Sequence, residues 1–595
     1  MATTLPSGFT RTASGRTTYY PDGVGDETPV RRPSNPYAPR HIPIANFMTR
    51  HAREASMSGA SHYNDIDFED DDDKKTVGSA STARNSETHI RYRDGEVPPV
   101  PTLPWKRSSD EADLEKQESE QKPDNGEEEK DPNLIEWDGP DDPENPLNFS
   151  PMRKWIITIS MGLMTFVITF ASSVFSTATQ PTAREFGVST EVTTLGTSLF
   201  VLGFAVGPII WGPLSELYGR KVPLFIGYTL FGIFQIPVAV AVNLETIMLC
   251  RFFGGVFGSA PLGIVGGALA DFWGPVDRGV AVCIFAGATF IGPVAGPIMG
   301  GFITMSHLGW RWTAWITMIM AAFFGVIGLF LIPETFAPLL LQKRAKKIRF
   351  ETKNWAIHAK ADESKVDLKT IVQKYLLRPF AMLVMEPILL VVTLYMALIY
   401  GILYLFFTVY PITFQQQRGW NAGVGALPFL GILIGVVLGG IFITVATKTR
   451  FARKLKEEGH VVPEERLLPM IVGGAIFPAG MFWFAWTSNP NILWVPQVIA
   501  GVPIGMGILM IFLQGLNYLI DVYMMNANSA IAANTFVRSF LGGGFPMFAM
   551  AMYNKLGVPW ATSLLGFLAV ALFPAPILFY IYGAKIRKLS KYSPS

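Results

Sequence analysis

Two long apolar runs are joined by the short segment Gly212-Pro-Leu-Ser-Glu-Leu-Tyr-Gly-Arg-Lys-Val-Pro-Leu224. This connection carries three charged side chains, whereas the runs 195–211 and 222–242 on either side carry none. Apolar segments of this kind suit a hydrocarbon core of about 30 Å, and basic residues collect in cytoplasmic loops. The pattern therefore predicts a tight helical hairpin of a polytopic membrane protein, with its turn at the cytoplasmic face.

The composition disfavours a soluble multidomain enzyme. Of the 595 residues, 49% are hydrophobic and 16% are charged, against about 25% charged residues in an average soluble domain. The net charge of +2 decides little, because an acidic N-terminal stretch offsets the basic loops. Cys250 and Cys283 both lie in apolar runs, so we expect neither a disulfide framework nor a cysteine-based metal site.

The motifs of enzymes and of ATP-driven pumps are absent from the sequence. It contains no Gly-x-x-x-x-Gly-Lys-Ser/Thr loop and no His-Glu-x-x-His pair. Aromatic residues are not interleaved with the basic loops, which disfavours nucleic-acid binding. We therefore expect no catalytic residues, no metal, no cofactor and no nucleic-acid partner.

Residues 1–150 differ in composition from the rest of the chain. They are rich in Ser, Thr, Pro and charged residues, and they include the acidic stretches 65–75 and 111–131. Such segments cannot bury enough apolar surface to fold. We predict a disordered cytoplasmic tail, which is either a solvated spacer or a segment for phosphorylation or trafficking.

Twelve apolar segments follow, and each is long enough to span a bilayer. A charged stretch, 333–386, is expected to form a cytoplasmic central loop between an N-terminal half, 151–332, and a C-terminal half, 387–595. The sequence thus predicts an all-α membrane protein with twelve transmembrane helices in two six-helix halves. The predicted spans lie near 155–178, 191–213, 222–242, 246–269, 279–303, 311–332, 387–410, 424–446, 467–487, 492–515, 527–551 and 561–583.

The placement of charge supports this count. Lys and Arg concentrate after the second, fourth, sixth, eighth and last segments. The positive-inside rule then puts both termini in the cytoplasm, which requires an even number of spans. Gly212 and Gly440 each precede a basic residue, Arg220 and Lys448, by eight positions, which is a weak sign of repeated halves.

The connection 212–221 resembles the signature loop between the second and third helices of the major facilitator superfamily, with Glu216 where the family usually has Asp. The stretch 251–261 resembles the fourth-helix motif of that family, and 287–301 resembles the fifth-helix motif of its drug:proton antiporters. In this order, the motifs are typical of the fungal twelve-span branch of that group, whose members export drugs, polyamines or toxins.

The resemblance implies a conformational latch in the signature loop. In the family, the acidic residue meets a helix N-terminus of the opposite half, where a carboxylate is favourable by roughly 0.3–1 kcal/mol. A tight turn that only sets the topology is the alternative. The implied latch residues are Gly212, Glu216, Gly219, Arg220 and Lys221.

The resemblance also implies proton coupling by Arg251 and Asp271 on the fourth helix. A cation within a membrane segment is costly and points to a function. At 1.5 Å per residue the two residues lie roughly 30 Å apart, so we expect the ends of a relay or two separate gates. The alternatives are that Arg251 snorkels to the outer interface and that Asp271 is an ordinary helix-end residue.

The fifth-helix motif contains no reactive side chain. Its glycines permit close contact between helices, and its prolines remove backbone hydrogen bonds and bend the helix. We expect a hinge beside the cavity that also seals against proton leakage. The motif residues are Gly287, Gly292, Pro293, Gly296, Pro297, Gly300 and Gly301.

Aromatic and polar residues of the C-terminal half predict a substrate cavity. The aromatic members follow i, i+4, i+7 on the seventh helix and share one face. Flat apolar or cationic compounds would stack on such a face, although the same residues can equally face lipid or another helix. The predicted cavity residues are Tyr400, Tyr404, Phe407, Gln514, Asn534 and Arg538.

Together, these observations predict a monomeric secondary transporter in the lipid bilayer. We expect it to export amphipathic or cationic compounds, such as drugs, toxins, polyamines or a secondary metabolite, by proton antiport with alternating access. A proton-coupled nutrient importer of the same fold and a non-transporting membrane sensor are the alternatives. We expect the plasma membrane as its location, or else the vacuolar membrane.

Overall fold

The computed structural model describes residues 9–11, 17–19, 131, 133–363 and 372–593. Two compact units are distinguished, Met1–Arg53 and Glu54–Ser595. In the first unit, strand β1 (Phe9–Arg11) pairs antiparallel with strand β2 (Thr17–Tyr19). Most of the predicted disordered tail lies outside the described residues.

The N-terminal half consists of long apolar helices joined by short turns. Side-chain caps define where several of them begin: Ser150, Ser189 and Asn243 each accept a hydrogen bond from a backbone N–H of the first turn. The helices are α3 (Pro151–Val174), α4 (Thr179–Phe186), α5 (Thr190–Leu217), α6 (Lys221–Ala239), α7 (Leu244–Phe272), α8 (Pro275–Met305) and α9 (Trp312–Leu331).

The C-terminal half has the same character. Short π-helical turns, η4 (Pro411–Gln417) and η6 (Thr447–Phe451), extend two of its helices. The helices are α14 (Pro387–Tyr410), α15 (Phe429–Ala446), α16 (Ala452–Glu458), α17 (Leu467–Trp486), α18 (Trp494–Ile499), α19 (Gly501–Tyr523), α20 (Ala527–Leu572) and α21 (Pro574–Arg587).

Eleven helical segments of the described residues are long and apolar enough to cross a membrane, and the last one, Ala527–Arg587, contains 61 residues. At 1.5 Å per residue a straight helix of that length would measure about 90 Å, three times a bilayer core of about 30 Å. The backbone breaks at Gly557, with φ 73° and ψ 162°. The segment therefore supplies two passes, and the twelve predicted spans are confirmed.

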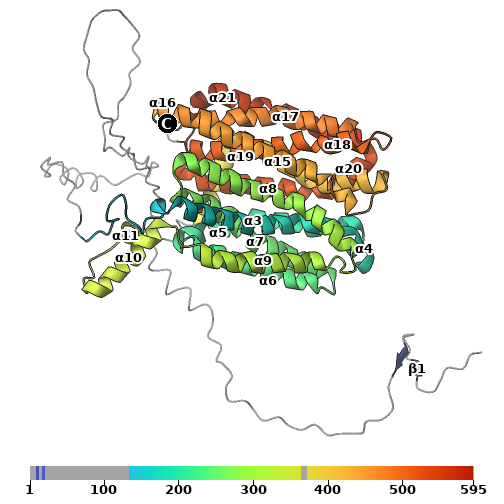
Figure 1. Cartoon of the computed structure of the whole chain (residues 1–595), viewed down its shortest axis with the longest axis horizontal. Coiled ribbons are helices and arrows are strands. Elements are labelled where there is room, and N and C mark those ends of the chain that lie inside the picture. Colours follow the sequence, from blue (N-terminus) through green and yellow to red (C-terminus); the bar gives the residue numbers. More distant parts are fainter. Residues whose placement is uncertain (1–8, 12–16, 20–130, 132, 364–371, 594–595) are drawn as a thin grey trace, which may run out of the picture. The chain divides into compact units, whose positions relative to one another are not determined.

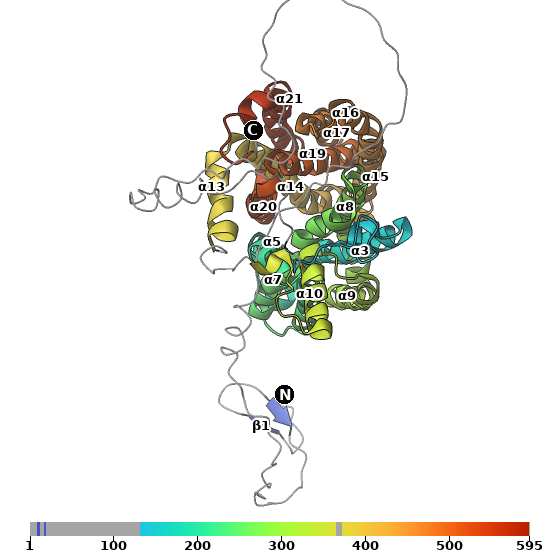
Figure 2. The same cartoon turned by 90° about the vertical axis from the view of Figure 1, so that its left-hand side faces the viewer.

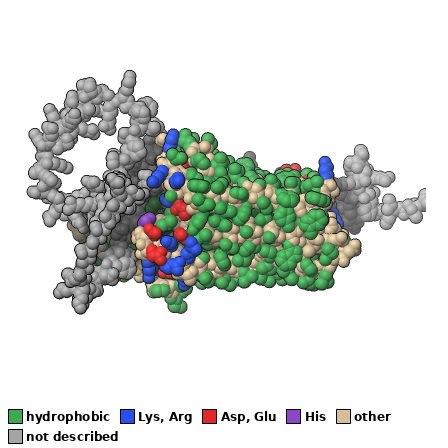
Figure 3. Space-filling model, turned by 90° about the horizontal axis from the view of Figure 1, so that it is seen from above, with side chains coloured by type: hydrophobic (Ala, Val, Ile, Leu, Met, Phe, Trp, Pro, Cys, Tyr) green, Lys and Arg blue, Asp and Glu red, His purple; other side chains and the backbone are tan. Residues whose placement is uncertain are grey.

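The helices lie side by side along a common direction, with the N-terminal half next to the C-terminal half (Figure 1). The halves pack together mainly through two helix pairs, α5 with α20 and α8 with α15, as the view along the helices also shows (Figure 2). On the face in Figure 3, hydrophobic side chains form a broad band, and charged side chains gather mainly at one end. This distribution fits a body embedded in a bilayer.

Helix boundaries differ from the prediction at one important place. The second span was expected to end at 213, but α5 continues to Leu217. Pro213 is tolerated inside the helix, and the helix ends where Gly219 adopts a left-handed φ of 81°. Glu216 therefore projects from the last helical turn and not from a loop.

Residues 133–150, which we assigned to the disordered tail, are folded. His358 bridges this segment to the central connection, because its backbone N–H donates to Asn133 O at 2.9 Å and its carbonyl accepts from Ile135 N at 2.8 Å. Arg344 binds the carboxylates of Asp138 and Asp142. Composition did not reveal these contacts because their partners lie more than 200 residues later.

The central connection 333–386 is largely helical where it is described. It contains α10 (Ala337–Thr352), α11 (Lys360–Glu363), a π-helical turn η3 (Val372–Leu377) and α13 (Arg378–Met385).

Candidate functional site

The turn between α5 and α6 is built around Arg220, the residue before α6. Its Nε donates to Asp271 Oδ2 at 3.0 Å, and Nη1 donates to Ser215 Oγ at 3.1 Å. Its guanidinium lies 4.7 Å from the centre of the Phe336 ring. Arg220 therefore ties the end of α5 to the end of α7, so that Asp271 belongs to this cluster.

Glu334 caps the N-terminus of α6. Its carboxylate accepts from the backbone N–H of Arg220 at 2.8 Å and of Lys221 at 3.2 Å. A helix N-terminus favours an anion because its first N–H groups lack partners within the helix. The Lys221 ammonium donates to Leu329 O at 3.1 Å. Sequence reasoning assigned Glu334 no role, although its acidic side chain follows the sixth span directly.

Glu216 reaches the opposite half of the protein. Its Oε1 accepts from Asn528 Nδ2 at 2.7 Å, and Asn528 lies in the first turn of α20. The structure thus places Glu216 beside a helix N-terminus of the C-terminal half, as the family resemblance implied. The residues grouped as a latch therefore make two kinds of contact: Glu216 contacts the C-terminal half, whereas Arg220 and Lys221 bind partners within the N-terminal half.

The C-terminal half contains a matching ion pair that sequence reasoning missed. Arg466 precedes α17 as Arg220 precedes α6, and its Nε donates to Asp521 Oδ2 at 2.9 Å near the end of α19. Its guanidinium lies 3.6 Å from the centre of the Phe451 ring. Gly440 and Lys448 lie near the end of α15 and in η6, as Gly212 and Arg220 lie near the end of α5 and just after it, so their spacing stays a weak sign of the repeat. The better signal is an arginine at the start of each half's third helix, with an aspartate at the end of its fourth helix.

Arg251 is buried inside the N-terminal half, with 3% of its surface exposed. Its three guanidinium nitrogens donate to backbone carbonyls: Nε to Gly196 at 2.8 Å, Nη1 to Ala171 at 3.0 Å and Nη2 to Ser172 at 3.3 Å. The guanidinium also lies 4.7 Å from the ring centres of Phe175 and Phe200. Among the contacts of the described residues, none joins Arg251 to Asp271. The burial of Arg251 argues against the snorkelling alternative.

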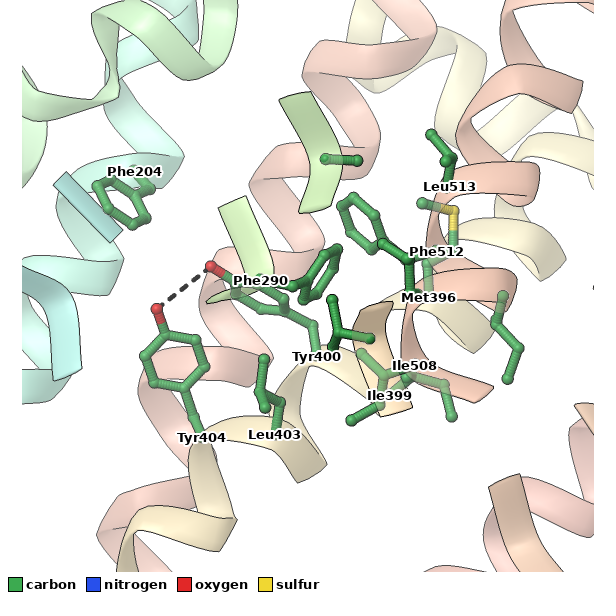
Figure 4. Packing of buried hydrophobic residues seen from close by; sticks show 14 of the residues in the cluster. Phe204, Phe290, Met396, Ile399, Tyr400, Leu403, Tyr404, Ile508, Phe512 and Leu513 are labelled. Carbon is green, nitrogen blue, oxygen red and sulfur yellow. Dashed lines mark hydrogen bonds between the residues drawn. The ribbon is translucent and has the colours of Figure 1, made fainter. Parts of the chain in front are cut away.

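A chain of hydrogen bonds leads from Arg251 across to the C-terminal half. Ser172, whose carbonyl accepts from Arg251, also shares a hydrogen bond of 2.7 Å between its hydroxyl and that of Tyr404. The Tyr400 hydroxyl donates to Tyr404 at 3.4 Å, as Figure 4 shows. The ring of Tyr400 lies 4.9 Å from the guanidinium carbon of Arg538. Ser172, Tyr404 and Tyr400 thus form a hydroxyl row between two buried arginines of opposite halves: Arg251 binds the Ser172 carbonyl, and Arg538 lies against the Tyr400 ring.

The predicted cavity residues are all buried, but they do not form one group. Tyr400 and Arg538 lie together with Phe512, and Figure 4 shows Phe512 beside Tyr400. The Asn534 amide donates to Thr393 Oγ1 at 3.3 Å, and its carbonyl oxygen has no hydrogen-bond partner among the described residues.

Phe407 continues the row of Tyr400 and Tyr404, whereas Gln514 lies elsewhere. Phe407 packs on Tyr404 and on Phe429 of α15. Gln514 lines a pocket of about 240 Å³ with residues of α15, η6 and α17, among them Thr447, and with Arg466, which precedes α17. Gln514 therefore lies apart from the aromatic face, because positions close together on a helix point in different directions. Its part in a substrate cavity stays a prediction.

The fifth-helix motif packs α8 directly on α3. A Cβ atom at Gly292 would lie 2.8 Å from Phe166 O, and one at Gly296 would lie 2.8 Å from Val174 N. Gly300 follows at the same spacing of four residues and also faces Val174. Gly301 instead faces Ala422 O of the C-terminal half, whereas Gly287 has no neighbour within 4 Å. Pro293 and Pro297 lie within the same helix.

Residues 161–546 match the family model named Major Facilitator Superfamily. This protein belongs to the major facilitator superfamily. The fold agrees: a solved proton:xylose symporter of the family superposes with a TM-score of 0.53 over 73% of this chain and 96% of its own, at 16% identity.

Within the described residues, no group of three or more His, Cys, Asp and Glu side chains is arranged to hold a metal ion.

Fungal relatives of this family member are much more similar in sequence. The citrinin biosynthesis cluster MFS transporter of Monascus ruber is 61% identical, and the match covers 78% of this chain and 92% of that protein. The cercosporin MFS transporter of Cercospora nicotianae is 47% identical, with 78% and 90% covered. These relatives support the expected fungal efflux-type branch, and this superfamily member is accordingly a multi-pass membrane transporter.

Proposed function

We propose that this protein exports a small organic secondary metabolite in exchange for protons. The observation that carries the proposal is the buried chain from Arg251 through Ser172, Tyr404 and Tyr400 to Arg538, because it places polar groups of both halves at one central site. Buried polar groups in membrane segments mark substrate and proton pathways. Two relatives are named as a citrinin biosynthesis cluster transporter and a cercosporin transporter, and these names support a metabolite as the substrate.

Alternating access is supported by contacts between the halves at both ends of the helices. At one end, Glu216 binds Asn528. At the other end, the backbone N–H of Gly423 donates to Met305 Sδ at 3.1 Å. In the proposed cycle, one contact breaks while the other holds, so that the central site opens to one side at a time.

Proton coupling is proposed to act through Asp271. Protonation would remove its charge and weaken its ion pair with Arg220. Since Glu216 lies at the end of α5, four residues before Arg220, loosening of the connection would also shift the contact of Glu216 with Asn528. Arg251 is proposed to hold the backbone carbonyls of Gly196, Ala171 and Ser172 in place beside the substrate site. The Gly292, Gly296 and Gly300 contacts keep α3 and α8 together as one rigid unit.

The experiment is transport by the full-length protein in liposomes that contain a pH-sensitive dye. Citrinin is the first compound to test because it is named with a 61% identical relative. We expect citrinin to accumulate when a pH gradient is imposed, with protons moving the opposite way, and we expect a protonophore to stop both movements. Accumulation that persists without a gradient, or that needs ATP, would refute proton antiport.

The orientation of the protein in the membrane is part of the same proposal. Basic residues of the connections, among them Arg220, Arg344 and Arg450, are proposed to face the cytoplasm together with both termini. We propose that the protein acts as a monomer in the plasma membrane. Labelling of a tag at either terminus should require permeabilised cells, and labelling of intact cells would contradict this orientation.

A further inference from the structure

Acidic and basic side chains lie at different depths in the membrane helices. In the membrane-crossing helices of the described chain, every Asp and Glu lies within three residues of a helix end. Arg251 and Arg538, by contrast, are the eighth and twelfth residues of α7 and α20, counted from Leu244 and Ala527. At 1.5 Å per residue, Arg538 lies about 16 Å from the start of its helix, near the middle of a core of about 30 Å.

The two arginines differ in how their charge is satisfied. Arg251 donates to three backbone carbonyls. Arg538 is 92% buried, since 8% of its surface is exposed, and its Nε has no hydrogen-bond partner among the described residues. Its neighbours are aromatic faces: the guanidinium carbon lies 4.9 Å from the ring centre of Tyr400 and 4.7 Å from that of Phe512.

An unpaired cation at this depth is costly, because burial removes its hydration and the rings replace only part of it. Buried cations normally pair with a carboxylate or with backbone carbonyls, as Arg220, Arg466 and Arg251 do here. A guanidinium that lacks such a partner retains donors for a planar anion, which it can bind in a bidentate manner. The flat rings beside it suit an aromatic skeleton attached to that anion.

We propose that Arg538 binds an anionic group, a carboxylate or an ionised phenol, of a flat aromatic substrate that stacks on Tyr400 and Phe512. This assignment rests on the proposed transport function and replaces the cationic substrates expected from the sequence. Asn534 precedes Arg538 by one helical turn and shares its face. Its unpartnered carbonyl oxygen accepts a hydroxyl group of the same substrate.

The test measures equilibrium binding to the full-length protein in lipid nanodiscs with three matched probes. These are 2-naphthoate, its neutral methyl ester, and the cation 2-(aminomethyl)naphthalene. We expect wild type to bind the carboxylate about tenfold or more tightly than the other two. Arg538→Gln should weaken carboxylate binding by about tenfold to a hundredfold, as expected for a lost hydrogen bond to a charged group, and change ester binding less than about twofold. Arg538→Lys should retain part of the preference.

Arg418→Gln is the matched control. Arg418 donates to the carbonyls of Pro490, Ile492 and Asn489 in a connecting loop, so this variant should bind all three probes as wild type does. Asn534→Asp keeps Arg538 and gives it an internal carboxylate. This variant should lose the preference for the carboxylate and bind the amine more tightly. If Arg538→Gln does not fold, Asn534→Asp by itself tests whether Arg538 binds the anion.

The assignment is overturned if wild type binds none of the probes, binds all three equally, or prefers the amine. It is also overturned if neither variant changes the affinity for 2-naphthoate. Arg538-dependent binding of the carboxylate without gradient-driven uptake would leave the anion site standing and refute the proposed transport. Gradient-driven uptake without Arg538-dependent anion binding would refute the anion site and leave the proposed transport standing.

Discussion

The hydroxyl oxygen of Tyr404 lies 2.7 Å from Oγ of Ser172, and this hydrogen bond joins α14 of the C-terminal half to α3 of the N-terminal half. Both residues are fully buried. Ser172 also donates to Thr169 O at 2.6 Å, so its proton is already used and Tyr404 is the donor to Ser172. The direction of the chain from Tyr400 to Tyr404 to Ser172 is thereby set.

Tyr404→Phe should slow transport clearly and lower the thermal stability of the protein only slightly. The change removes the hydroxyl that bridges the two halves but keeps the ring, and a single buried hydrogen bond contributes about 0.5–1.5 kcal/mol. Transport rate and thermal unfolding are measured on the same preparation. Tyr553→Phe is the control, because the Tyr553 hydroxyl bonds to Thr562 within the C-terminal half. Equal losses of transport in both variants would contradict a special role for the bridge.

Asp271→Asn should uncouple transport from protons. The variant imitates a permanently protonated carboxyl, so exchange of labelled substrate across the membrane should continue while gradient-driven accumulation is lost. Arg220 and Asp271 are largely but not fully buried, so removing one partner should cost less than the roughly 3–5 kcal/mol of a fully buried pair, and thermal unfolding measures this cost. Asp521→Asn breaks the matching pair with Arg466 and should cost similar stability. If it uncouples transport equally, the specific role of Asp271 is refuted.

Gly296→Ala should force α3 and α8 apart. A Cβ atom there would lie 2.8 Å from Val174 N, and overpacking of this kind costs about 1–3 kcal/mol. Gly287→Ala in the same helix meets nothing within 4 Å and should leave the protein unchanged. Thermal unfolding in nanodiscs compares the two variants. A harmless Gly296→Ala would show that this helix contact is loose.

The contact of residues 133–135 with the central connection should weaken as pH rises. A hydrogen bond to Ala356 O raises the pKa of His358 above its usual 6.5, and Glu363 and Asp131 act in the same direction. Because the folded pKa lies above the unfolded one, the stabilisation is complete below pH 6.5 and disappears as pH rises through the folded value.

Hydrogen exchange checks this pH dependence. The amide of Ile135, which donates to His358 O, should have a protection factor that falls between pH 6 and pH 8.5. In His358→Asn the fall should be absent. A protection factor that stays constant in the wild type would contradict the expected titration of His358.

The sequence by itself determined the architecture and much of the site. Membrane spans can be recognised in the sequence because a helix needs about 20 consecutive apolar residues to cross the hydrocarbon core, whichever helices pack beside it. Gly292, Gly296 and Gly300 predicted close packing for the same local reason, since only small side chains at that spacing permit it. The cost of burying a cation made Arg251 a candidate before any partner was known.

Only the tertiary structure decided which residues act together. Arg220 binds Asp271, 51 residues away, and Tyr404 binds Ser172, 232 residues away. Hydropathy and helical period describe one segment at a time, so they contain no information on such pairs. Arg538 shows the difference most clearly. The sequence marked it as a polar residue of a cavity for cations, whereas the packing of α14, α19 and α20 surrounds it with aromatic rings and leaves it without a carboxylate, because every acidic residue of these helices lies near an end.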